Sequence, residues 1–113
     1  MGGFVKGQVV IVPFPFANLT GMKKRPALVV APLRGDDLIL CQITTVGRVD
    51  DYIITLNNND FAKGSLPHPS FIRCDHLFTA DSSLIIRPAG MLTKRKIQEV
   101  ISKIIGILSI ETD

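Results

Sequence analysis

The sequence of 113 residues contains no apolar run close to the roughly 20 residues that a membrane-crossing helix requires. Its first ten residues, MGGFVKGQVV, also lack the basic segment, apolar core and small-residue cleavage site of a secretion signal. Internal repeats and low-complexity linkers are missing as well, and a chain of this length can bury a core without disulfides or metal. We therefore expect one cytoplasmic domain over residues 1–113, with no membrane attachment.

Cysteine and histidine are too scarce to form a recognisable metal site. The chain has two cysteines, Cys41 and Cys74, and two histidines, His68 and His76. Cys74 and His76 would share one face of a strand, but a zinc site needs a second pair of ligands at similar spacing. We expect neither a metal nor a cofactor. The cysteines are expected to be small buried hydrophobic residues, with a disulfide between them as the alternative.

Turn residues divide most of the chain into short segments rich in β-formers. Their patterns predict loops over residues 16–21 and 63–69, and strands over residues 8–14, 27–31, 38–46, 52–56, 71–77 and 82–87. The run at 27–31 is apolar on both faces, which predicts a central strand. From Thr93, a potential N-cap, the period becomes helical, with an apolar stripe formed by Ile97, Val100, Ile101, Ile104, Ile105 and Leu108. Together these segments predict a mainly β fold, a small β-barrel capped by a terminal helix.

The chain is mildly basic, with a formal net charge of +3, which permits a nucleic-acid or acidic-protein partner without requiring one. Lys23, Lys24 and Arg25 form a cluster with no acidic residue before it and none after it until Asp36. The ordinary interpretation is a soluble turn that protects a strand end. Arg25, however, abuts Pro26 and the central strand, where a guanidinium on rigid backbone offers a fork suited to phosphate.

A second cationic cluster lies at the predicted helix start and consists of Lys94, Arg95 and Lys96. Positive charges at a helix N-terminus oppose the helix dipole and gain nothing locally. We therefore expect these three side chains to form a solvated surface.

Two strands carry polar residues in patterns that chemistry could use. One face of the segment 38–46 turns polar at Gln42 and Thr44, which places these residues near a surface or pocket. Arg73 and Asp75 are two residues apart and point the same way, about 7 Å from each other. Taken singly, these patterns also fit an exposed threonine and a weak surface ion pair. Strict alternation would put one set of side chains on the face of Arg73, namely Phe71, Asp75 and Leu77, and another set on the opposite face, namely Ile72, Cys74 and His76.

The order of the segments GQVVIVPFPF, KKRPALVV, ITT and IRCDHLFTAD, followed by an amphipathic helix, resembles the MazF/PemK (Kid) toxin family. The resemblance runs from about residue 7 to residue 108 and is most specific in RPALVV and RCDHLFTAD. It implies an SH3-like barrel of the CcdB/PemK type and a homodimer with RNA bound across the interface. It also implies metal-independent, sequence-selective cleavage of single-stranded RNA through the 2′-hydroxyl, which leaves a cyclic phosphate and a 5′-hydroxyl.

The resemblance assigns four catalytic residues: Arg25, Thr44, Arg73 and Asp75. Asp75 would help to take the 2′-hydroxyl proton, and Arg25 and Arg73 would stabilise the dianionic transition state. Thr44 would orient a phosphate oxygen. The expected RNA-binding residues surround this set and are Asn18, Thr20, Lys23, Lys24, Gln42, Thr45 and Arg48. The loop histidine of Kid-type members has no counterpart in residues 18–21.

The implied partners are the RNA substrate and a cognate antitoxin whose acidic tail covers the RNA groove, with operator DNA bound only by the toxin–antitoxin complex. Two alternatives stay open because one fold can serve several targets. The chain could be a toxin of the same barrel type that binds a protein such as gyrase, or a degenerate toxin that retains only a scaffolding or regulatory role.

Overall fold

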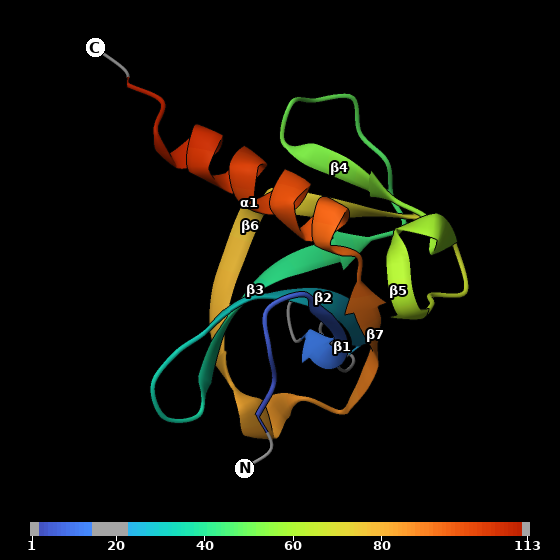
Figure 1. Cartoon of the computed structure of the whole chain (residues 1–113), viewed down its shortest axis with the longest axis vertical. Coiled ribbons are helices and arrows are strands. Elements are labelled where there is room, and N and C mark those ends of the chain that lie inside the picture. Colours follow the sequence, from blue (N-terminus) through green and yellow to red (C-terminus); the bar gives the residue numbers. More distant parts are fainter. Residues whose placement is uncertain (1–2, 15–22, 112–113) are drawn as a thin grey trace.

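The computed structural model describes residues 3–14 and 23–111, so the predicted loop at 16–21 lies outside the described residues. In these ranges, seven strands form one antiparallel sheet in the order β4-β6-β3-β2-β1-β7-β5. The strands are β1 (Gln8–Phe14), β2 (Lys23–Pro32), β3 (Asp37–Thr44), β4 (Ile53–Leu56), β5 (Phe61–Gly64), β6 (Ser70–Asp81) and β7 (Arg87–Leu92). The sheet curls into a half-barrel, and helix α1 (Lys94–Leu108) crosses one side of it (Figure 1). The mainly β fold with a terminal helix is as predicted.

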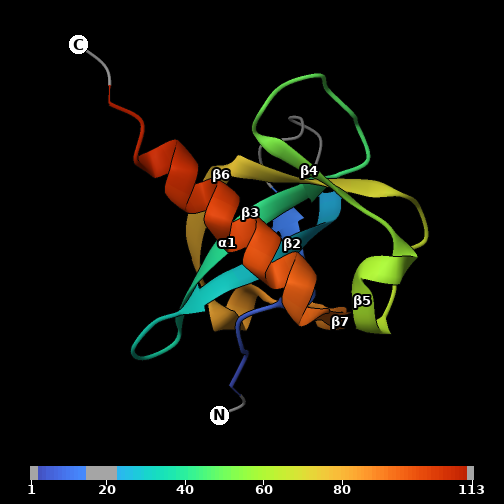
Figure 2. The same cartoon turned by 45° about the horizontal axis from the view of Figure 1, so that its top comes forward.

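The curled sheet buries side chains on both faces. A helix-side cluster contains Leu28, Val30, Cys41, Ile72 and Cys74 together with residues of α1, and Figure 2 shows the helix lying across these central strands. A second cluster occupies the other face and includes Val10, Val12, Phe14, Ala27, Val29, Leu38 and Leu40. Successive side chains of β2 alternate between the two clusters, which explains why its sequence is apolar on both faces. The prediction of a central strand there is confirmed, since β2 pairs with both β1 and β3.

Helix α1 begins as predicted. The hydroxyl oxygen of Thr93 accepts a hydrogen bond of 3.2 Å from the backbone N–H of Lys96, and Val100 and Ile104 are buried in the helix-side cluster. Ile105 and Leu108, by contrast, are 58% and 72% exposed. The predicted stripe therefore packs only in part, because the C-terminal end of the helix projects beyond the sheet (Figure 1).

Lys96 corrects the prediction of a solvated cationic surface. Lys94 and Arg95 are exposed, but Lys96 is buried and its ammonium donates a 3.0 Å hydrogen bond to the carbonyl oxygen of Thr55. Its Nζ atom also lies 3.6 Å from Asp60 and 2.9 Å from Glu99. Acceptors at Thr55 and Asp60, together with Glu99 on the same helix, therefore offset the unfavourable position of this cation at the helix start.

Two predicted elements were wrong, the strand at 82–87 and the start of the loop at 63–69, which overlaps strand β5. Residues 82–87 do not form a strand: Ser82–Leu84 is a 3₁₀ turn, η2, and β7 starts only at Arg87. The carboxylate of Asp81 accepts a 2.8 Å hydrogen bond from the N–H of Ser83 and so starts this turn. Strand β5, which follows the 3₁₀ turn η1 (Asn58–Asp60), was missed because it is a short edge strand that pairs only with β7. No helix among the described residues is both long and apolar enough to cross a membrane.

Candidate active site

A bulge in β6 shapes the candidate site. Cys41 of β3 pairs with Leu77, and Ile43 pairs with Ile72, so two steps along β3 correspond to five steps along β6. Residues 73–76 therefore leave the ladder with β3, as in an enlarged β-bulge. Backbone contacts fix the bulge from both sides. The N–H of Cys74 donates to the carbonyl oxygen of Tyr52 at 2.9 Å. The thiol of Cys41 donates to the carbonyl oxygen of Arg73 at 2.8 Å.

The bulge overturns the strict alternation expected for 71–77. Leu77 packs against the helix-side cluster that contains Ile72 and Cys74, although it was expected on the opposite face. The ring of His76 contacts Phe14 and Phe78 on the other face, with centroids 6.4 Å and 6.2 Å away. The three extra residues in the bulge, an odd number, invert the alternation, so His76 lies on the side of the second cluster and not with Cys74.

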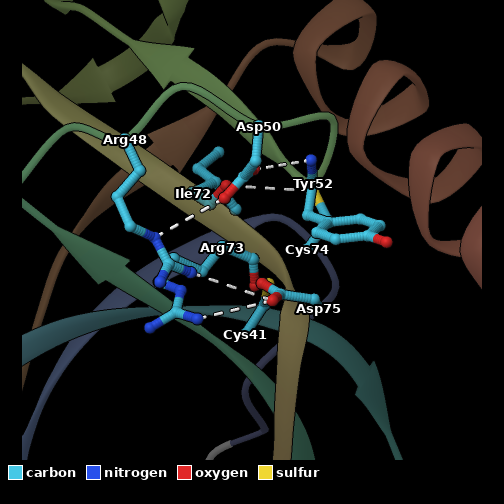
Figure 3. A network of polar contacts seen from close by, with 8 residues as sticks. All are labelled: Cys41, Arg48, Asp50, Tyr52, Ile72, Arg73, Cys74 and Asp75. Carbon is cyan, nitrogen blue, oxygen red and sulfur yellow. Dashed lines mark hydrogen bonds and ion pairs between the residues drawn. The ribbon is translucent and has the colours of Figure 1, made fainter.

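An ionic network is centred on Asp75. One carboxylate oxygen of Asp75 lies 3.4 Å from a terminal guanidinium nitrogen of Arg73 and 4.0 Å from one of Arg48 (Figure 3). Arg48 also pairs with Asp50 at 3.5 Å, and Asp50 accepts a 2.8 Å hydrogen bond from the N–H of Tyr52. The loop between β3 and β4 is thereby tied to the bulge. The side chains of Arg73 and Asp75 are 25% and 26% exposed, which leaves the pair accessible to a ligand.

Strand registers bring Thr44 and Arg25 to the same face as Arg73. Thr44 pairs with Phe71, and antiparallel partners project to the same side of a sheet, which is the side of Arg73. Ala27 pairs with Gln42 in the same way, and this register, extended by two residues, aligns Arg25 with Thr44. The four residues proposed as catalytic thus lie on one sheet face, and Arg25 forms no ion pair with any described residue.

Two buried polar atoms on this face lack a hydrogen-bond partner among the described residues. They are Oε1 of Gln42 and Nε of Arg73. A buried group left without a partner costs on the order of 1–3 kcal/mol. One acceptor and one donor on this face therefore have no protein partner among the described residues. Thr44 is buried, and its hydroxyl oxygen accepts from the N–H of Val46 at 3.1 Å.

Three groups near the bulge have perturbed acidity. The pKa of Cys41 is raised, first by the neighbouring Cys74 thiol and then by burial. The Cys41 thiol in turn lowers the pKa of Cys74. The pKa of His76 is lowered by burial and, to a smaller extent, by the positive charge of Arg73. His76 is thus biased toward the neutral form.

The structure describes some of the remaining predicted residues and not others. Lys23 and Lys24 are exposed at the start of β2, and Thr45 and Arg48 are exposed in the loop after β3. Asn18 and Thr20 lie outside the described residues. Asp50, which binds Arg48, was not predicted, although its two-residue spacing from Arg48 repeats that of Arg73 and Asp75. Among the described residues, no three His, Cys, Asp or Glu side chains are grouped as metal ligands.

A small antiparallel sheet curled into a half-barrel and covered by a terminal helix defines a mainly β class of small folds, and the sequence comparison is more specific. Residues 5–108 match the model of the PemK-like, MazF-like toxins of type II toxin–antitoxin systems, and the chain belongs to this family. No individual curated protein is similar enough to count as a match.

Solved structures share the fold at low sequence identity. An endoribonuclease in complex with its cognate antitoxin, from Mycobacterial species, superimposes with a TM-score of 0.77 at 15% identity, over 98% of this chain and 100% of that chain. Toxin MazF-mt6 of Mycobacterium tuberculosis gives 0.72 at 18% identity, over 93% and 99%. MazF in a MazE–MazF crystal of Deinococcus radiodurans gives 0.74 at 21% identity, over 95% and 96%.

Proposed function

We propose that this protein is a metal-independent, sequence-selective endoribonuclease that cleaves single-stranded RNA. Family membership supports a toxin, and similar folds occur in proteins described as endoribonucleases. The observation that carries the proposal is the Arg73–Asp75 pair at 3.4 Å, on the sheet face that it shares with Thr44 and Arg25. A base, two cations and a hydroxyl donor on one face are the groups that internal transesterification of RNA needs.

The reaction begins at the ribose next to the scissile phosphate. Asp75 accepts the proton of the 2′-hydroxyl, and the 2′-oxygen attacks phosphorus as the bond to the 5′-oxygen breaks. The products are a 2′,3′-cyclic phosphate and a 5′-hydroxyl, whose oxygen takes its proton from solvent. Arg73 and Arg25 stabilise the charge that develops on the phosphoryl oxygens. A guanidinium deprotonates only above about pH 12, so the arginines act electrostatically.

Thr44 positions the phosphate in this scheme. Its hydroxyl oxygen already accepts a hydrogen bond from Val46, so its own proton is free to be donated to a phosphoryl oxygen. Gln42 lies on the same face and is proposed to bind a base or a ribose hydroxyl, which requires its buried and unpartnered Oε1 to become exposed. DNA lacks the attacking group, which accounts for selectivity toward RNA.

The proposal includes a set of partners. The similar structures include toxins crystallised with a cognate antitoxin, and we infer that an antitoxin with an acidic segment neutralises this chain by covering its cationic face. We further infer a cytoplasmic homodimer, in which RNA lies across both copies, and binding of operator DNA only together with the antitoxin.

The test is incubation of the purified protein with a long single-stranded RNA in EDTA, followed by mapping of the new 5′ ends. Discrete cuts at a short recurring sequence that disappear in Arg25→Ala support the proposal. Intact RNA would refute it and would favour a protein-binding or inactive toxin.

A further inference from the structure

A cavity of about 460 Å³ lies beside the candidate active site and is lined by none of residues 73–76. Its volume falls within the range of about 300–1,000 Å³ that is usual for small-molecule sites. It is formed where β2, β7 and the segment between β5 and β6 come together. Arg87 and His68, which no sequence motif singled out, both line it.

The buried part of the lining is apolar and rigid. Ile43 and Leu66 belong to the helix-side cluster, and Ile11 is also buried, while Pro26 and Ala89 are half-buried beside them. An apolar surface of this kind fits the face of a nucleobase, because removing that face from water costs little free energy.

The exposed part of the lining is cationic. It includes Lys24 and Arg87, with the half-exposed Arg25 beside them, and no carboxylate among the described lining residues. Hydroxyl groups of Thr45 and Ser65 also line the cavity. Cations suit a phosphate, and imidazole and guanidinium planes are surfaces on which unpaired RNA bases stack.

Backbone and side-chain hydrogen bonds hold both new residues in place. The hydroxyl of the buried Ser70 donates a 2.9 Å hydrogen bond to the carbonyl oxygen of His68. Arg87 pairs with Ile11 in the sheet, and the preceding N–H, of Ile86, donates to the Ile11 carbonyl at 2.8 Å. The backbone that carries both residues is therefore fixed before a ligand binds, which reduces the entropic cost of binding.

The cavity meets the candidate active site at Arg25, and its apolar lining lies on the helix side of the sheet. Arg25 lines it and also belongs to the proposed catalytic set. An RNA phosphate that contacts Arg25 therefore lies at the edge of the cavity.

We propose that the cavity binds a nucleotide next to the scissile phosphate, with its base on the apolar lining beside His68 and its phosphate at Lys24 and Arg87. Arg87 and His68 are then specificity-determining residues. This inference rests on the proposed function, since it names a subsite of the same RNA path.

Binding is tested separately from cleavage. A short random-sequence 2′-O-methyl RNA cannot be cleaved, because its attacking hydroxyl is blocked, and its affinity for the full chain is measured by fluorescence anisotropy over a series of salt concentrations. Arg87→Ala should weaken binding about tenfold and reduce the salt slope by about one. Arg34→Ala, which removes an exposed cation from the turn between β2 and β3, is the matched control and should bind like the parent.

Selectivity is tested by mapping the cut sites of the parent, Arg87→Ala and His68→Ala. Relaxed preference at one position, with KM raised and kcat retained, supports the subsite. Parental affinity and parental cut sites in both variants would overturn it, as would weakened antitoxin binding without any effect on RNA. If the parent binds RNA through Arg87 but does not cleave it, the subsite stands and the proposed nuclease fails. If the parent binds no RNA, both fail.

Discussion

The thiol of Cys41 donates a 2.8 Å hydrogen bond to the backbone carbonyl oxygen of Arg73, across the gap that the β6 bulge opens in the sheet. Residues 73–76 have left the ladder with β3, so this contact replaces a ladder hydrogen bond at the point where Arg73 emerges. Cys41 is fully buried, and it acts on Arg73 without reaching the substrate face. It is a positioning residue for the proposed site.

Cys41→Val should impair catalysis more than binding. The substitution keeps a small apolar side chain but removes the donor, which leaves a carbonyl unpaired and allows Arg73 to shift. We expect kcat to fall ten- to a hundredfold, as an order of magnitude, with little change in KM. Cys41→Ser, which restores a donor, should recover much of the rate. Steady-state cleavage kinetics distinguish the two, and equal kcat values in parent and Cys41→Val would rule out the positioning role.

Asp75→Asn should abolish most of the activity. The amide retains the shape of the carboxylate but cannot take the 2′-hydroxyl proton, and loss of a general base costs roughly 10²–10⁴-fold in rate. The matched control is Asp37→Asn, which neutralises an exposed carboxylate at the first residue of β3. Cleavage of one defined RNA is followed for both. Comparable rates in Asp75→Asn and the parent would remove Asp75 from the mechanism.

Local signals in the sequence were sufficient for several elements. The N-cap at Thr93 acts within its own helix turn, and the apolar run of β2 needs only burial on both faces, so both were predicted correctly. The spacing of Arg73 and Asp75 likewise predicted a pair on one face, and the structure places the two in contact.

Features that depend on distant segments were not predictable. The backbone of the bulge is contacted by Cys41 at Arg73 and by Tyr52 at Cys74, and neither contact can be read from the local sequence pattern. Period-two alternation therefore assigned His76 to the wrong side. The cavity beside Arg25 joins segments as far apart as residues 11 and 87, so Arg87 carried no signal of its own.

His76 should make stability depend on pH. Its folded-state pKa is lowered by burial, so the unfolded chain binds the proton more readily than the folded chain. The contribution of His76 to the free energy of unfolding is complete when the pH is above the unfolded-state pKa of about 6.5. It decreases as the pH drops through that pKa, and it becomes constant once the pH is below the folded-state pKa. Urea unfolding of the parent and of His76→Phe, which keeps a ring beside Phe14 and Phe78, should give a smaller pH slope for the variant in this window. The same pH dependence of the free energy of unfolding in both proteins would contradict this role of His76.

Lys96→Met should destabilise the fold although it removes a charge from a basic chain. The change leaves the Thr55 carbonyl without its donor and deprives Asp60 of its cation, while the aliphatic stem stays buried. Because the site is buried, the expected loss is about 1–3 kcal/mol in the free energy of unfolding. Lys94→Met is the matched control, since Lys94 is exposed on the same helix turn and should change stability by no more than about 0.5 kcal/mol. Denaturant titrations of the parent and both variants test this prediction. Equal unfolding midpoints for Lys96→Met and Lys94→Met would mean that the buried ammonium adds nothing to stability. The helix would then be held on the sheet by its apolar contacts alone.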